Sequence, residues 1–100
     1  MQAGWIRHTV AFRLRHERGS QQEEQFLSEA AKLASIPGVE SFEILAQVGE
    51  KNDFDYGISM EFSDRAAYDS YNEHPEHVCF VRDWWLPQVA DFLEIDYAGR

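Results

Sequence analysis

Apolar and polar residues alternate along four segments of this chain, and a period of two predicts β-strands with one buried face. The first strand is expected over residues 6–14, where one face carries Ile6, His8, Val10, Phe12 and Leu14. The same alternation predicts strands over residues 42–48, 55–62 and 92–97. In the last strand, Leu93, Ile95 and Tyr97 share one face, which assigns Phe92 to the opposite face.

Two segments between these strands have apolar residues at helical spacing instead. Ser20 and Glu23 form a capping box, which predicts the start of an amphipathic helix that ends near Ser35. A second helical region starts near residue 65 and is interrupted at His74-Pro75. Proline cannot continue a helix but suits the first position of a new one, so a further helix is expected from Pro75 to about Pro87.

The element order is therefore β-α-β-β-α-β over a single domain, residues 1–100. This order predicts an α+β, ferredoxin-like fold, in which helices cover one face of a four-stranded antiparallel sheet. The other sheet face would be uncovered in a monomer, and a second copy packed sheet to sheet would cover it. We therefore expect a homodimer whose contact face includes Trp5, Ala11, Leu45, Gly57, Ser59 and Phe92.

Charge and composition exclude several classes of partner. Eighteen acidic and nine basic residues give a net charge of −9, which disfavours nucleic acid and anionic membrane surfaces. No segment approaches the ~20 apolar residues of a membrane span, and the start of the chain does not resemble a signal peptide, so a cytoplasmic protein is expected. The single cysteine, Cys79, excludes an intrachain disulfide and is expected to be a small buried apolar residue.

The candidate chemistry gathers at the helix break, where Tyr71, His74 and His77 follow one another closely. Each has a structural alternative: Tyr71 as a core residue, His74 as a helix cap and His77 as a brace of the break. His8, on the apolar face of the first strand, is similarly either a satisfied core histidine or a cavity residue. A metal site at His74-x-x-His77 is disfavoured, because proline lies between the histidines and no third ligand is near in sequence.

Four motifs, in order along nearly the whole chain, resemble the stress-responsive A/B-barrel (Dabb) family. Residues 8–14 are similar to its H-x-V-x-F-x-L strand and residues 36–39 to its I-P-G-V turn. Residues 71–80 resemble its Y-x-x-H-P-x-H-x-x-F signature, and residues 95–97 fit its ending. The resemblance implies a dimeric α+β barrel in which each subunit encloses a pocket between helices and sheet.

In the family's polyketide cyclases, a Tyr and a His of this signature form the working pair, which implies Tyr71 and His77 here, with His8 also lining the pocket. Histidine can remove a proton from between two carbonyl groups, and a tyrosine hydroxyl can stabilise the enolate. The expected substrate is a small polyketone or phenolic compound, and neither metal nor coenzyme is needed. The predicted apolar lining consists of Val10, Phe12, Phe26, Ile58, Phe80, Trp84 and Trp85.

Two other classes of function stay open at this point. The first is a non-catalytic stress-response dimer that sequesters a small molecule or none. The second is an oxygenase or haem-degrading enzyme of the same architecture, which ranks last because its Asn, Trp and His pattern cannot be mapped onto this sequence. Architecture alone supports all three readings, so the residues of the cavity must separate them.

Overall fold

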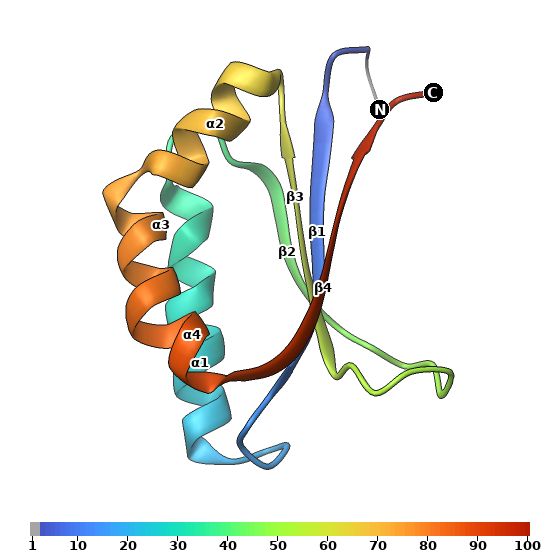
Figure 1. Ribbon diagram of the computed structural model, residues 1–100, viewed down its shortest axis with the longest axis vertical. Coiled ribbons are helices and arrows are strands. Elements are labelled where there is room, and N and C mark those ends of the chain that lie inside the picture. Colours follow the sequence, from blue (N-terminus) through green and yellow to red (C-terminus); the bar gives the residue numbers. More distant parts are fainter. Residues whose placement is uncertain (1–2) are drawn as a thin grey trace.

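The computed structural model describes residues 3–100 and has the predicted order of elements (Figure 1). The four strands form one antiparallel sheet in the order β2-β3-β1-β4, and the helices all cover one face of it. The prediction of a ferredoxin-like fold is confirmed. The elements are β1 (Ile6–Leu14), α1 (Gln21–Ala31), β2 (Glu40–Ala46), β3 (Tyr56–Phe62), α2 (Arg65–Glu73), α3 (Pro75–Phe80), α4 (Leu86–Gln88) and β4 (Val89–Ala98).

Helical turns of other types join these helices. A 3₁₀ turn, Lys32–Ser35, extends α1 to the predicted end, and a π-helical turn, Val81–Trp85, joins α3 to α4. The helical region that begins at Pro75 therefore continues to Gln88, one residue beyond the expected end. No helix within residues 3–100 is long and apolar enough to cross a membrane.

The start of α1 shows how local sequence and tertiary contacts act together. The Ser20 hydroxyl accepts a hydrogen bond from the Glu23 amide (3.2 Å), as the capping box predicts. The Glu23 carboxylate reaches back to the Gly19 amide (2.9 Å) and also accepts from the Tyr56 hydroxyl (2.7 Å). Glu23 is buried, and these bonds satisfy its charge while they tie α1 to β3.

The centre of the core lies between α1, the π-helical turn and strand β1. Phe12 and Phe26 are fully buried, and their ring centroids are 5.7 Å apart. Trp85 closes the group, with its ring 5.2 Å from Phe12. These aromatic rings fill the space between helices and sheet at this end, and an open space remains beyond them, towards α2 and α3.

Strand β4 corrects one prediction from the sequence. It begins at Val89, and Phe92 lies directly opposite Phe12 of β1, so Phe92 faces the helices and not the open sheet face. Leu93, Ile95 and Tyr97 lie on the open face instead. Pairing with β1 sets which face each residue occupies, and apolar alternation alone assigned the faces in reverse because both faces of β4 carry large apolar residues.

Two further predictions were wrong. Strand β2 ends at Ala46. The Gln47 backbone N–H still donates to the Asp55 carbonyl (2.9 Å), but Val48 lies beyond this bond and is 94% exposed. Cys79 is exposed, since the inward side of α3 is formed by its neighbours His77 and Phe80. Its sulfur lies 3.6 Å from an Arg82 nitrogen on the outer surface.

Candidate functional site

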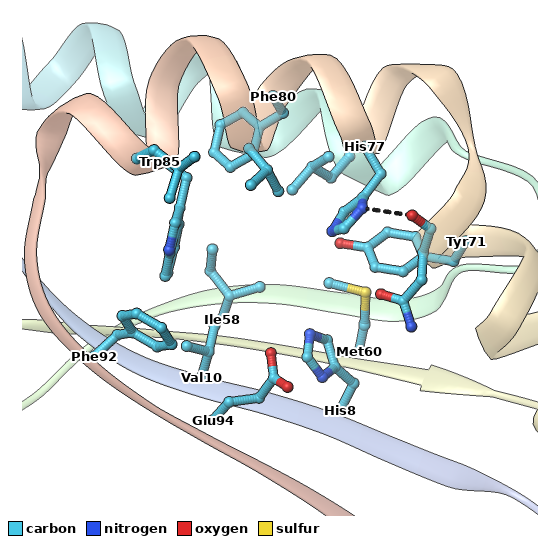
Figure 2. A pocket seen from close by; sticks show the side chains of 14 residues that line it. His8, Val10, Ile58, Met60, Tyr71, His77, Phe80, Trp85, Phe92 and Glu94 are labelled. Carbon is cyan, nitrogen blue, oxygen red and sulfur yellow. Dashed lines mark hydrogen bonds between the residues drawn. The ribbon is translucent and has the colours of Figure 1, made fainter.

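A cavity of about 260 Å³ lies between the sheet and the helices α2 and α3 (Figure 2). Its floor comes from β1, β3 and β4, and its roof comes from the helices on either side of the His74-Pro75 break. The residues that line it are His8, Val10, Leu33, Ile58, Met60, Tyr71, Asn72, His77, Phe80, Val81, Trp85, Leu86, Phe92 and Glu94. Most of this lining is apolar, with a few polar groups that converge, which is typical of a small-molecule site.

The helix break brings Tyr71 and His77 together. His74 caps α3, since its Nδ1 accepts a hydrogen bond from the Glu76 amide (3.1 Å), and Pro75 takes the first helical position. The chain therefore changes direction between the last turn of α2 and the first turn of α3. As a result the Tyr71 and His77 rings lie 4.4 Å apart, and both face the cavity (Figure 2).

His77 is held as a neutral imidazole. Its Nδ1–H donates to the Asn72 carbonyl oxygen (3.1 Å), which leaves the lone pair of the neutral ring on Nε2. Burial lowers the pKa of His77, and the nearby His8 and His74 lower it further, while the bond to Asn72 opposes these effects. Because that pKa lies below the ordinary value near 6.5, the ring is mainly unprotonated at neutral pH.

Tyr71 is held in place by the core, with its hydroxyl protonated. Only 2% of the residue is exposed, and its ring packs 5.1 Å from Phe62 in the core. Burial raises the pKa of Tyr71, and the charges of Tyr68 and Glu94 add to this shift, so the hydroxyl keeps its proton. The Tyr71 oxygen points towards the cavity and His77 (Figure 2). Tyr71 is thus both a core residue and a polar group of the cavity wall.

A partly buried polar network holds His8 on the opposite wall. Its Nδ1 lies 2.6 Å from an Asp96 carboxylate oxygen, and the Tyr68 hydroxyl donates to the other oxygen (2.7 Å). His8 and Asp96 are direct partners across the β1–β4 pair, so the strand register creates this contact. A carboxylate at Nδ1 favours the tautomer that leaves Nε2 free. His8 is 6% exposed and is therefore both a satisfied buried histidine and a cavity residue.

The residues predicted to line the pocket separate into two groups in the structure. Val10, Ile58, Phe80 and Trp85 line the cavity together with His8, Tyr71 and His77. Phe12 and Phe26 are core residues behind it and are not among the lining residues. Trp84 lies in a groove on the outer surface, as expected for a residue adjacent to Trp85 on a helix.

Sequence reasoning did not find several cavity residues. Met60 continues the alternation of Ile58 along β3, and that signal was available. Glu94 and Phe92 were missed because the face assignment of β4 was reversed. Asn72 lines the cavity, and its backbone carbonyl oxygen accepts the hydrogen bond from His77. A pattern of side chains in the sequence cannot indicate such a role for a backbone atom.

One group of side chains has ligand atoms close enough to hold a cation. Atoms of His8, Glu94 and Asp96 lie within 4.8 Å of one another, and within residues 3–100 no other group of this kind occurs. Asp96 already accepts two hydrogen bonds, from His8 and Tyr68, so its carboxylate oxygens are engaged within the protein. His74 and His77 each use Nδ1 for the backbone at the helix break.

The fold and the cavity together define a ferredoxin-like α+β protein with a small-molecule-sized cavity at a helix break. A family model, the stress responsive A/B barrel domain, matches residues 6–98. The chain belongs to this family, as its motifs indicated. None of the curated proteins matches the sequence.

Solved structures agree with this assignment. A Dabb family protein with a ferredoxin-like fold from Mesorhizobium loti is 54% identical, with a TM-score of 0.96 over 97% of this chain and 98% of that one. A dimeric ferredoxin-like protein of unknown function from Thermobifida fusca is 25% identical, with a TM-score of 0.81 over 98% and 93%. A hydroxynitrile lyase from Passiflora edulis is 15% identical, with a TM-score of 0.86 over 99% and 96%, which is a likeness of fold alone.

Proposed function

We propose that this protein binds a small, uncharged polyketone or phenolic molecule and, on a polyketone, catalyses the proton transfer that closes a ring by intramolecular aldol addition. The single observation that carries the proposal is the Tyr71–His77 pair, 4.4 Å apart in an otherwise apolar cavity. A neutral imidazole with a free Nε2 is suited to remove a proton, and the Tyr71 hydroxyl is suited to donate a hydrogen bond. The apolar walls exclude water and hold a flexible chain in a folded conformation.

The chemistry needs only groups of this chain. His77 Nε2 removes a proton from the carbon between two carbonyl groups, and the electron pair moves onto a carbonyl oxygen, which accepts a hydrogen bond from Tyr71. The enolate carbon then forms a bond to a distant carbonyl carbon of the same molecule. The resulting alkoxide takes the proton back from His77. No electron is gained or lost overall, and the base is regenerated.

Ligand binding tests the proposal without a known substrate. A panel of phenolics, β-diketones and polyketide lactones is expected to contain compounds that raise the unfolding temperature, because a ligand that binds only the folded state stabilises it. The increase should be smaller in Tyr71→Phe, and unchanged in Tyr97→Phe, which loses a hydroxyl from the opposite sheet face. If no compound stabilises the protein, the proposal fails. If a compound binds without chemical change, the protein is a non-catalytic binder.

Acid should remove the activity of His77. Since burial lowers its pKa, the neutral base is present at neutral pH and is lost as the pH falls through a value below 6.5. The same shift means that protonation opposes folding, so the contribution of His77 to stability is also lost below its unfolded pKa. Titration of the histidine ring protons by NMR is expected to show His77 with a midpoint below that of a histidine in a peptide. A midpoint above it would contradict the structure.

We also propose that two copies pair through their open sheet faces. Leu45, Leu93, Ile95 and Tyr97 leave large apolar side chains exposed there, on the face that no helix covers (Figure 1). Exposed apolar patches on a sheet indicate a protein interface. The related Thermobifida fusca protein is described as dimeric, which supports this interpretation.

A charge placed on this face should separate the copies. Leu93→Asp buries a carboxylate in the proposed interface, so the protein is expected to become monomeric by size-exclusion chromatography with light scattering. Val78→Asp is the matched control, because Val78 is exposed to a similar extent (49% against 51%) but lies on the helical side. A monomeric wild type, or loss of the dimer in the control alone, would contradict the proposal.

A further inference from the structure

Glu94 is the one acidic residue among those that line the cavity within residues 3–100. It lies opposite Val10 in the β1–β4 pair, so its side chain faces the helices. Figure 2 shows its carboxylate directed into the cavity beside His8, with Phe92 on the same strand. No other side chain of the described residues donates a hydrogen bond to it or forms an ion pair with it.

Glu94 is exposed, and the basic side chain beside it is His8, whose ring nitrogen lies within 4.8 Å of its carboxylate. Asp96 is the next residue of β4 on the same face of the sheet as Glu94. Its two carboxylate oxygens are hydrogen-bonded to His8 and Tyr68 and so already have partners. No lysine or arginine is among the lining residues of the cavity. Glu94 also contributes to the raised pKa of both Tyr68 and Tyr71, which is consistent with a carboxylate close to their hydroxyls.

We propose that Glu94 selects the ligand: its carboxylate accepts a hydrogen bond from a phenol or enol hydroxyl and excludes ligands that carry a carboxylate. A carboxylate is only an acceptor, so it requires a donor from the ligand when the cavity is filled. An anionic ligand would instead place a second negative charge beside a carboxylate that no lysine or arginine of the cavity lining neutralises. This inference rests on the proposed function and adds the class of molecule that the same cavity takes.

Two probes that differ in one group test the inference. Orcinol is a neutral dihydroxy aromatic compound, and the corresponding dihydroxybenzoate carries a carboxylate in place of its methyl group. Calorimetric titration near neutral pH, with EDTA present to remove free metal ions, should show orcinol binding the wild type about tenfold or more tightly than the benzoate. Glu94→Gln should reduce this ratio by about tenfold, because it removes the repelling charge.

Two further variants separate charge from shape. Glu94→Asp keeps the carboxylate and should retain most of the discrimination. Glu73→Gln removes a charge from the exposed end of α2, away from the cavity lining, and should leave the ratio unchanged. Equal binding of both probes to the wild type, or an unchanged ratio in Glu94→Gln, overturns the inference about Glu94 but leaves the binding cavity intact. If neither probe nor any β-diketone binds, the proposed function fails as well.

Discussion

Replacing His77 with alanine is expected to lower the turnover of a β-polyketone by about a hundredfold to ten-thousandfold, the usual effect of removing a positioned acid–base group. The reason is geometric: the His77 ring lies against Tyr71, with centroids 4.4 Å apart, whereas the His8 ring is 6.2 Å from Tyr71 and contacts Asp96 through Nδ1. Ligand binding should weaken much less, because the apolar walls remain. The measurement is turnover of a compound that stabilises the wild type, with kcat and KM determined separately.

His74→Ala is the matched control for this result. His74 lies three residues earlier and belongs to the same signature, but it caps α3 and does not line the cavity. Its loss should reduce stability by about 1 kcal/mol, as for other helix caps, and leave kcat close to that of the wild type. A His77→Ala variant that keeps full turnover, or a His74→Ala variant that is folded but loses it, would contradict the assignment.

Phe12→Ala is expected to lower the free energy of unfolding by about 3–5 kcal/mol. Phe12 is fully buried and its ring contacts Phe26, Tyr56 and Trp85, with centroids 5.2 to 5.9 Å away. Truncation leaves a void among rigid aromatic neighbours that cannot collapse into it. The free energy of unfolding of a small domain is only about 5–15 kcal/mol in total. Denaturant titration should therefore show a much lower midpoint for this variant.

The control for this loss is Val48→Ala. Val48 is almost fully exposed beyond the end of β2, so its truncation should change the stability by less than about 0.5 kcal/mol. If Phe12→Ala does not fold, Phe12→Leu provides a milder test with a smaller loss of stability. A value near zero for either Phe12 variant would mean that this core does not pack as described.

Much of the fold could be predicted from sequence because its signals are local. The alternation of β1, the Ser20 cap and the break at Pro75 each act within a few residues, and each defines the start or end of an element. The faces of β4 could not be predicted in the same way. They depend on the pairing of Phe92 with Phe12, a contact between residues 80 positions apart in sequence.

The candidate site was predictable only in part for a similar reason. Tyr71 and His77 come from one helix break, so a local pattern contains both. The sequence does not show which residues of a buried face reach the cavity. Phe12 and Val10 share one face of β1, yet Phe12 is covered by Phe26 while Val10 lines the cavity. Which residues line a cavity depends on the side chains that pack over them. The position of Glu94 in the cavity follows only from the β1–β4 register, which places it opposite Val10.

The proposed role of His77 is to remove a proton from carbon inside this cavity. Deuterium uptake from heavy water at the carbon between the two carbonyl groups of a bound β-diketone, followed by NMR, measures this step. We expect the wild type to exchange this position faster than buffer alone, and His77→Ala to show only the buffer rate although it still binds the compound. Equal exchange rates in the wild type, in His77→Ala and in buffer would mean that His77 is not the base.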